Sequence, residues 1–567
     1  MRKLYFAGCV FAAVACLGGC TKTNDIEPES KGVDFFAHVD NVDTKTSIDG
    51  LKVLWAKKDS IAIQVTKNHL AYATTLGIYK LADDAAGTNV GRFTYSSGAE
   101  QITGDEEFFA FYPASYCTAH KDNGYFYVDF PMTQYYEDNI GEKLPLPMYG
   151  IGSNRNVSFN YAGAVLKLRV WSKEKTSIHS CVISADNLSK RAFTYVKDGE
   201  WQPLSKAYDV NNLNMNMRKP LEISNDESNP TVITMIIPLA GTKTLTNLKF
   251  SINCEKGGSE LEKKSDLKVS PGTVVTFPVK ELTIEPDRMF VDGLEGEIDT
   301  EWVKTAEKSV KVTMVPSSKL SEGNFQKIME ATRNLHNKDK KIVLDLSRAN
   351  AKESTLKGLN TDNSYVGFCG GSNRDKGIKN ISKFYLPEGI TTILNRAFSY
   401  SGYTEIVLPS TLTQISGSPS NGCDSLVWKV AEGNKSFKAD EEGALYDFGM
   451  TTLMALNGGS GDSYIVKDGT TTIREWALYE NSVIKTVNIP ASVTKLSADC
   501  ISGTPNLTTI ICLGTKPAEF IPNTGKNKVG PSNKTKFLYV PTGCGKDYEA
   551  KWKTLLDEGN WQVVERN

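Results

Sequence analysis

The stretch YLPEGITTI, residues 385–393, decides the architecture of the C-terminal half of this 567-residue chain, because it recurs in other letters. VLPSTLTQI spans 407–415 and NIPASVTKL spans 488–496. Each copy has an apolar residue before a proline and further apolar residues three and six positions after that proline. A segment that keeps its apolar positions while their identity changes indicates a repeated structural unit.

The apolar residue before the bend returns at a nearly fixed distance along the chain. From Leu386 onward the steps are 22 or 23 residues, except for one step of 36 residues between Val430 and Val466. This period is typical of a leucine-rich-repeat solenoid, in which a coil buries its apolar edge only against neighbouring coils. The aligned positions are Leu344, Val366, Leu386, Leu408, Val430, Val466, Ile489 and Cys512.

Two segments break or precede this periodic region. Residues 321–337 predict a helix with Ser321 as its N-cap, and the helix leads into a buried-strand pattern at 342–346, as suits the N-terminal cap of a repeat stack. Within the long step, GALYDFGMTTLMAL (443–456) has two apolar runs around a turn and predicts an inserted hairpin. The helical face consists of Phe325, Ile328, Met329, Thr332 and Leu335.

Residues 320–567 resemble the BspA-like leucine-rich repeats of Bacteroidota surface proteins. At Asp499-Cys500-Ile501 the chain departs from the Ala-Phe pair that is usual in that family, so the number of regular coils stays open. The resemblance rests on Leu386-Pro387, Leu408-Pro409, Ile489-Pro490, Ala397-Phe398, Cys423-Asp424-Ser425-Leu426, Gly443-Ala444-Leu445-Tyr446 and Leu538-Tyr539-Val540-Pro541.

The N-terminal half has a different texture. From Val33 to about Val279, short β-rich runs alternate with Gly, Asn, Asp and Pro clusters, which predicts two β-sandwiches over about 250 residues. The polar stretch 286–319 reads as a linker. The ordered pieces Phe36-Ala37, Thr44-Lys45-Thr46, Trp55, Asp59-Ser60-Ile61, Phe109-Ala110-Phe111-Tyr112-Pro113, Val157-Ser158-Phe159 and Ala164-Val165-Leu166-Lys167-Leu168 resemble the fimbrillin family. That resemblance implies transthyretin-like sandwiches over 33–157 and 158–285.

The first twenty residues are a secretory signal. Arg2 and Lys3 precede a short apolar run, which ends in Leu17-Gly18-Gly19-Cys20. This end resembles the lipobox of bacterial lipoproteins, which implies that Cys20 is lipidated and becomes the first mature residue. Residues 21–32 are polar and acidic and predict a flexible tether. Acidic residues behind such a cysteine resemble the surface-export signal of Bacteroidota lipoproteins.

Composition gives no indication of catalysis or of nucleic-acid binding. Lys plus Arg (65) nearly cancels Asp plus Glu (66), and no catalytic, cofactor or metal-ligand motif is recognisable. We therefore expect no enzyme, no cofactor and no metal. The scattered cysteines read as small buried side chains, although a disulfide stays open. They are Cys117, Cys181, Cys254, Cys369, Cys423, Cys500, Cys512 and Cys544.

Together these features predict a lipid-anchored adhesin at the outer membrane, with a leucine-rich-repeat head on a fimbrillin-like stalk. The expected partners are proteins on host or bacterial surfaces, and the membrane through the lipid. One alternative is a minor or terminal fimbrial subunit. By family resemblance such subunits polymerise after cleavage behind an arginine, yet no arginine occurs between Cys20 and Arg92. A second alternative is a glycan-binding lipoprotein. Tyr125 and Tyr127, on one face of a predicted strand, are either a platform for stacking sugars or proteins or ordinary half-buried tyrosines.

Overall fold

A computed structural model defines the fold. It describes residues 34–39, 55–67, 70–71, 76–88, 90–98, 106–119, 126–128, 133–136, 146–189, 195–197, 200–202, 209–239, 241–286, 288–291, 311–316, 319–333, 341–358, 367, 369–374, 376–521, 529–557 and 559–566.

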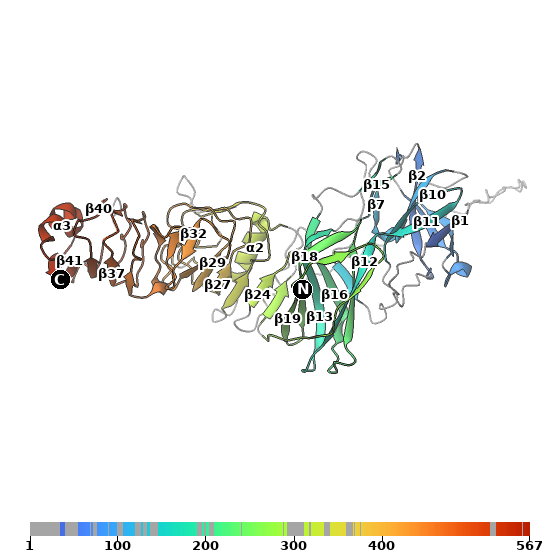
Figure 1. The fold of residues 1–567 in the computed structure, drawn as a ribbon, viewed down its shortest axis with the longest axis horizontal. Coiled ribbons are helices and arrows are strands. Elements are labelled where there is room, and N and C mark those ends of the chain that lie inside the picture. The colour runs from blue at the N-terminus through green and yellow to red at the C-terminus, as the bar shows by residue number, and fades with distance from the viewer. Residues whose placement is uncertain are drawn as a thin grey trace, which may run out of the picture.

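The molecule is elongated and mainly β (Figure 1). Two β-rich units lie at one end, and a stack of coils extends away from them to helix α3 (Gly545–Lys551) at the other. Cys20, the tether 21–32 and Val366 lie outside the described residues. Among the described residues, no helix has the length and apolar character needed to cross a membrane.

The first unit closes its sheet on itself. The order is β3-β2-β4-β5-β1-β11-β10-β6, and β6 pairs back onto β2, whereas we predicted a sandwich of separate sheets. Trp55 anchors the interior, with Phe93 and Tyr112 packed edge-on at 5.0 and 5.3 Å between ring centroids. The strands are β1 (Phe35–Val39), β2 (Ser60–Lys67), β3 (Leu70–Ala71), β4 (Gly77–Leu81), β5 (Val90–Ser97), β6 (Phe108–Tyr112), β10 (Met148–Ser153) and β11 (Asn156–Tyr161).

The predicted boundary between 157 and 158 is wrong. It falls inside β11, which pairs with β1 and β10 of the first unit. The crossing to the second unit comes after Tyr161, because β12 (Gly163–Trp171) pairs with strands of that unit only. In addition, β9 (Thr133–Tyr136), from the segment expected in the first domain, pairs in parallel with β16 (Asp209–Glu222) of the second. A short β7–β8 pair, Cys117–Ala119 and Phe126–Val128, precedes it.

The second unit has two sheets that share one apolar core, as predicted for a sandwich. One sheet has the order β17-β12-β21, with β22 also on β12, and the other β19-β18-β13-β16-β9. Leu166 and Ile233 from the first sheet and Ile183, Met215 and Phe250 from the second are buried between them. The further strands are β13 (Ser177–Ser189), β14 (Tyr195–Lys197), β15 (Glu200–Gln202), β17 (Thr231–Pro238), β18 (Lys243–Cys254), β19 (Gly257–Lys263), β20 (Leu267–Val269), β21 (Val274–Thr276) and β22 (Lys280–Glu281).

In the stack, each regular coil has one long and one short strand, and equivalent strands of successive coils pair in parallel. The long strands form two sheets: β23 (Arg288–Val291), β24 (Lys311–Met314), β25 (Ile342–Asp345), β27 (Ile381–Tyr385), β29 (Glu405–Leu408) and β31 (Val427–Val430), then β35 (Ser463–Ile465), β37 (Thr486–Ile489), β39 (Thr509–Cys512), β41 (Lys536–Pro541) and β42 (Trp561–Arg566).

The shorter strands form the second row of the coils. The predicted hairpin is confirmed, because β33 and β34 are antiparallel and β34 then pairs in parallel with β36. These strands are β26 (Thr355–Leu356), β28 (Thr392–Ile393), β30 (Gln414–Ile415), β32 (Phe437–Ala439), β33 (Leu445–Asp447), β34 (Thr452–Ala455), β36 (Thr472–Ile473), β38 (Lys495–Leu496) and β40 (Glu519–Phe520).

The apolar ladder that the repeats predict is present from Leu386 onward, with Val430 partly buried. The predicted start at Leu344 is wrong by two residues, because Leu344 is in register with Phe384. Leu386, Leu408, Ile489 and Cys512 are each at most 4% exposed. Cys500 and Ile501 are buried in their coil, as Ala397 and Phe398 are in an earlier coil. The departure from the Ala-Phe pair therefore keeps a small buried residue followed by a large one. Burial of equivalent side chains in adjacent coils is what holds such an array together.

Helices cover both ends of the stack. Helix α2 (Glu322–Arg333) buries Phe325, Ile328, Met329 and Thr332 as predicted, and the Ser321 hydroxyl, which accepts from the N–H of Asn324, caps it. Leu335 lies outside the described residues. The C-terminal helices α3 and α4 (Lys553–Asp557) were not predicted; they bury Tyr548, Trp552 and Leu555 against the last coils.

The linker predicted over 286–319 is wrong, because β23 and β24 in that stretch begin the first long sheet of the stack. This start of the stack also docks on the second unit. The side chain of Asn253 in β18 pairs with both backbone groups of Phe290, at 2.8 Å to its N–H and 2.7 Å to its carbonyl. Val182, Phe290 and Val315 form an apolar cluster beside this pair.

Arg348, from the turn after β25, completes this junction. Its guanidinium donates to the Glu260 carboxylate at 2.5 Å and to the Ser251 hydroxyl at 2.7 Å, and it also contacts Ser184. The Arg348 and Glu260 side chains are 17% and 20% exposed. A charged pair shielded to this degree, together with an apolar cluster, holds the stack and the second unit in a defined contact.

Candidate binding surfaces on the repeat stack

The one site residue predicted with a role, Cys20, lies outside the described residues. Within the described part of the chain, His, Cys, Asp and Glu side chains form no group that could hold a metal ion. The eight later cysteines are free thiols. Burial raises the pKa of Cys181, Cys423, Cys500 and Cys512 to about 12. These thiols stay protonated and unreactive, which fits their interpretation as small core side chains.

The pairing of the long strands is interrupted in the middle of the stack. The first long sheet ends at β31 and the second begins at β35. The connection from short to long strand takes 12 residues from Ile393 to Glu405 and 13 from Ile473 to Thr486, but only ten from Leu453 to Ser463. One coil therefore lacks the full turn that its neighbours have on this side of the stack.

Asn457 holds the two parts together where the turn is short. Its side-chain oxygen accepts from the Ser420 hydroxyl and from the Trp428 indole N–H, both at 2.9 Å, and its amide donates to the Ser420 carbonyl at 3.0 Å. All three residues are buried. Because one side chain satisfies these buried polar groups, the core of the shortened coil has its hydrogen bonds although the coil lacks a full turn.

The full turns on either side of the short one share a backbone conformation. Tyr400, Gly422, Glu480 and Gly503 have φ between 56° and 69°, and they stand at equivalent places in their coils. Glycine adopts this left-handed conformation freely, whereas other L-residues pay of order 1–2 kcal/mol. Tyr400 and Glu480 stand on opposite sides of the short turn. They are the two members of this set in which a residue other than glycine has this strained backbone conformation.

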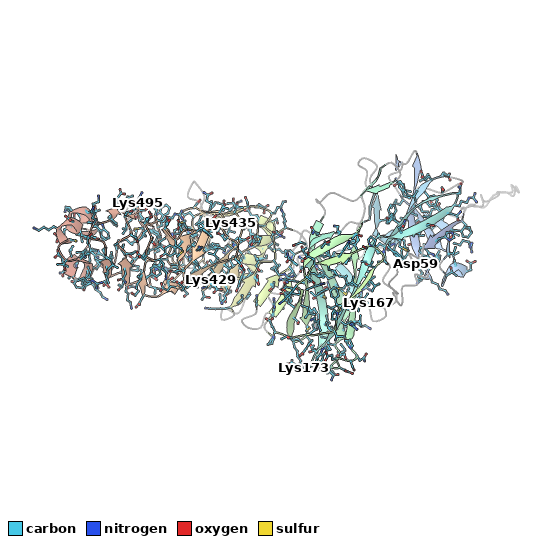
Figure 2. All side chains as sticks on the ribbon, in the orientation of Figure 1. Asp59, Lys167, Lys173, Lys429, Lys435 and Lys495 are labelled. Carbon is cyan, nitrogen blue, oxygen red and sulfur yellow. The ribbon has the colours of Figure 1, made fainter. Side chains whose placement is uncertain are left out.

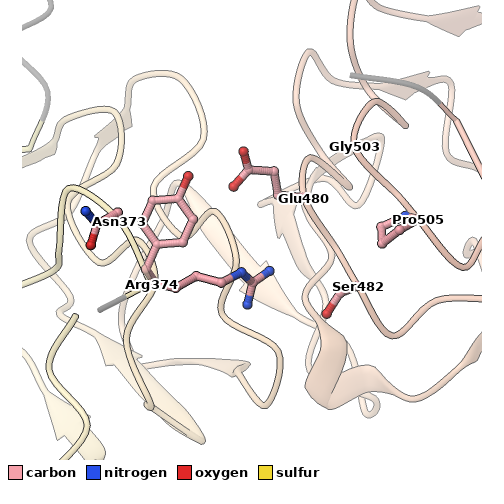
Figure 3. Close-up of a pocket in the computed structure, with 7 residues that line it drawn as sticks. Asn373, Arg374, Glu480, Ser482, Gly503 and Pro505 are labelled. Atoms are coloured by element: carbon pink, nitrogen blue, oxygen red, sulfur yellow. The ribbon is translucent and has the colours of Figure 1, made fainter. Parts of the chain in front are cut away.

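A cleft of about 430 Å³ opens at the missing turn. Figure 3 shows Asn373 and Arg374 on one wall and Glu480, Ser482 and Pro505 on the other, with the Arg374 guanidinium and the Glu480 carboxylate directed into the space between the walls. Tyr400 and Gly503 complete the lining. We call this site the turn cleft.

Polar contacts hold the walls of the turn cleft in place. Arg374 pairs with Asp424 at 2.9 Å, and the Ser482 hydroxyl donates to the other oxygen of Asp424 at 2.6 Å, so one carboxylate joins the two walls. Arg396 donates to the Tyr400 hydroxyl at 3.0 Å. Burial, followed by the nearby Glu480 carboxylate, raises the pKa of Tyr400 to about 12, which keeps its hydroxyl protonated.

The outward face of the first long sheet is charged. By register, its two outward rows are Lys311–Val343–Lys383–Glu405–Val427 and Thr313–Asp345–Tyr385–Val407–Lys429. Lys311 pairs with Asp345 at 3.0 Å and Lys383 with Glu405 at 3.6 Å. Lys429, on the last strand of this sheet, lies midway along the stack in Figure 2.

The outward face of the second long sheet carries no charge in its two rows. They are Ser463–Thr486–Thr509–Phe537–Gln562 and Ile465–Asn488–Ile511–Tyr539–Val564. Ile465 is 62% exposed, and the rings of Phe537 and Tyr539 stack with their centroids 6.0 Å apart. Exposed apolar residues next to aromatic ones are typical of protein interaction sites. We call these ten residues the C-terminal face.

Neither surface is predicted by the sequence patterns described above. The turn cleft joins residues up to 132 positions apart, from Asn373 to Pro505, and no local spacing relates them. Its one sequence signal is that Tyr400 and Glu480 stand at places where the matching coils have glycine, at Gly422 and Gly503. The C-terminal face had a clearer signal, since alternation along each strand places Ile465, Ile511 and Tyr539 opposite the buried ladder.

Comparison with known families agrees with the periodicity. The BspA type leucine rich repeat region matches six copies within residues 376–436 and 455–518, on both sides of the hairpin. The comparison with curated proteins found no match.

Several solved structures are distantly similar. A candidate cell adhesion protein from Bacteroides ovatus is 14% identical, with 45% of this chain and 95% of that chain covered and a TM-score of 0.29. A leucine-rich repeat protein from Eubacterium ventriosum is 15% identical, with 46% and 76% covered and a TM-score of 0.25. A fimbrial protein from Bacteroides ovatus is 11% identical, with 40% and 45% covered and a TM-score of 0.19. At these values the likenesses do not bear on function.

Proposed function

We propose that this protein is a surface-exposed lipoprotein of the outer membrane that acts as an adhesin. Lipid on Cys20 anchors it, the two β-rich units form the stalk, the second of them a transthyretin-like sandwich, and the repeat stack is the head that binds proteins on host or bacterial surfaces. The proposal includes no enzymatic activity, no cofactor and no nucleic-acid partner.

The C-terminal face is the observation that carries this proposal. It is a continuous parallel sheet at the end of the stack far from the two β-rich units (Figure 1). The two rows carry no charge of their own, and the Arg566 guanidinium lies over the Tyr539 ring, 5.3 Å from its centroid. Desolvating this face therefore costs less than desolvating the ion pairs on the first long sheet. Binding at such a face should depend only weakly on salt, because charge contributes little to it.

The test compares substitutions on the two faces in the full mature chain. Ile465→Asp places a charge at the most exposed apolar position of the C-terminal face. Val407→Asp places a charge in an outward row of the first long sheet and is the matched control. The probes are an array of extracellular-matrix proteins and whole bacterial cells. We expect Ile465→Asp to reduce adherence at least tenfold, because the new carboxylate would have to be desolvated on binding, and Val407→Asp to leave adherence unchanged. Equal adherence of all three proteins would refute the role of this face.

A fimbrial subunit is the second candidate, and the position of β1 favours it. Strand β1 lies between β5 and β11 and runs parallel to β11, so its loss would leave two strand edges unpaired. Unpaired edges are templates for a strand from another chain. Brief digestion with a lysine-specific protease, followed by a search for heat-resistant multimers on a gel, tests this candidate. Monomers alone after β1 is cut would exclude it.

A further inference from the structure

We propose that the turn cleft binds a neutral oligosaccharide. This site is separate from the C-terminal face and would add a second specificity to the head. The proposal rests on the shape of the cleft, on the kinds of polar group that converge in it, and on its balance of charge.

The shape follows from the short coil. Because the turn between Leu453 and Ser463 is two or three residues shorter than its neighbours, less of this coil projects between the two walls. The resulting volume of about 430 Å³ lies within the range of small-molecule sites, about 300–1,000 Å³. In the short turn itself, the buried Asn457 makes three hydrogen bonds to Ser420 and Trp428, so the polar groups of the shortened coil are satisfied.

The polar groups suit a ligand rich in hydroxyls. The Arg374 guanidinium and the Asn373 amide bring donors to one wall, while the Glu480 carboxylate on the facing wall, which already accepts from the Tyr400 hydroxyl, has lone pairs for a further hydroxyl. A sugar hydroxyl both donates and accepts, so a vicinal pair can bridge groups of opposite kind on the two walls. Tyr400 and Pro505 add flat apolar surface, against which the C–H face of a sugar ring can pack.

The charge balance disfavours ions. Arg374 is already paired with Asp424 at 2.9 Å, and among the residues that line the cleft Glu480 is the carboxylate. A sulfated or sialylated sugar would meet the Glu480 carboxylate, and a cationic ligand would meet Arg374. A neutral ligand avoids both repulsions and still satisfies the donors and acceptors.

The strained backbone supports a role in recognition. Tyr400 and Glu480 keep φ of 59° and 56°, where the equivalent turns use Gly422 and Gly503. Both walls therefore project a side chain into the cleft from a conformation that glycine would adopt more easily. The N–H of Tyr400 donates to the Asn421 carbonyl and that of Glu480 to the Ser502 carbonyl, which fixes each turn to its neighbouring coil. The walls are thus preorganised before a ligand arrives.

The experiment uses the full mature chain and free sugars. The probes are neutral di- and tetrasaccharides of glucose, galactose, mannose and N-acetylglucosamine, with sialylated and sulfated forms as the acidic arm, measured by saturation-transfer NMR and calorimetry. Glu480→Gln keeps the shape and removes the charge, and Tyr400→Phe keeps the ring and removes the hydroxyl. Glu519→Gln, at the exposed residue of strand β40, is the matched control.

We expect at least one neutral sugar to bind, with its Kd raised about tenfold or more by Glu480→Gln and unchanged by Glu519→Gln. Tyr400→Phe should weaken binding less, because the stacking surface remains. Binding of acidic sugars alone, of no sugar, or of neutral sugars equally well by Glu480→Gln would overturn the proposal. Loss of adherence through Ile465→Asp with sugar binding intact would show that the two sites are independent.

Discussion

Replacing Leu408 by alanine should loosen three coils of the stack at once. Leu408 is fully buried, and its strand lies between β27 and β31, with Leu408 in register with Val430. A leucine buried to this degree costs about 2–5 kcal/mol on truncation to alanine, from lost burial and from the cavity left behind. In a repeat array this loss passes to adjacent coils, because each is stabilised by its neighbours.

Two threonines on the next turn provide graded controls. Thr413 is exposed, and its hydroxyl donates to the Thr391 carbonyl at 3.1 Å, so Thr413→Ala should change stability by no more than about 0.5 kcal/mol. The Thr411 hydroxyl instead accepts from the N–H of Gly389 at 2.9 Å and donates to the Ile390 carbonyl at 3.0 Å. Thr411→Ala therefore loses a link between coils and should cost about 1 kcal/mol.

Hydrogen exchange read by mass spectrometry is the suitable assay, because it reports stability locally in a chain with several units. Leu408→Ala should reduce protection in β27, β29 and β31 while the two β-rich units keep theirs. Thr413→Ala should leave protection unchanged, with Thr411→Ala between them. Equal losses for Leu408→Ala and Thr413→Ala would mean that the assigned register is wrong.

Three further outcomes are expected. Arg348→Met should destabilise the junction by about 2 kcal/mol, because Glu260 loses its closest cationic partner. Unfolding in urea measures this loss. Small-angle scattering should also show a wider range of orientations of the stack relative to the second unit. Glu565 accepts from two backbone N–H groups, which lowers its pKa below the ordinary value near 4.5. The stability that it provides is thus present above about pH 4.5 and is lost as the pH falls through the lower folded pKa, so Glu565→Gln should flatten this acid limb of a thermal-melt series. Finally, Cys20→Ala should move the protein from the membrane fraction to the soluble fraction, and unchanged fractionation would exclude a lipid anchor there.

The stack was predictable because its pattern is local. An apolar residue at a fixed place in each coil is buried whatever its neighbours do, so the ladder through Leu386 and Leu408 follows from spacing alone. The same spacing places both Thr411 and Thr413 on the polar side of their coil and does not distinguish them. Which hydroxyl bridges two coils depends on the path of the backbone at Gly389, which periodicity does not encode.

The boundaries and the junction were not predictable in this way. Strands β23 and β24 have only four residues each and lie in polar sequence, so their pairing with β25 gives them their identity. The partners of Arg348 lie 88 to 164 residues before it in the chain. Contacts at such separations are set by how completed units dock. For this reason the sequence suggested a linker where the structure has an interface.

That interface has a mechanical consequence for a protein held by one end. If the stack hung from a slack connection, a pull on its far end would first straighten the connection and turn the head toward the load. Here Asn253 grips the backbone of Phe290, and Arg348 reaches back to Glu260, so head and stalk rotate as one lever. If the protein is the anchored adhesin proposed above, traction on a bound partner is transmitted as torque to its N-terminal end, and the C-terminal face keeps its orientation relative to the two β-rich units.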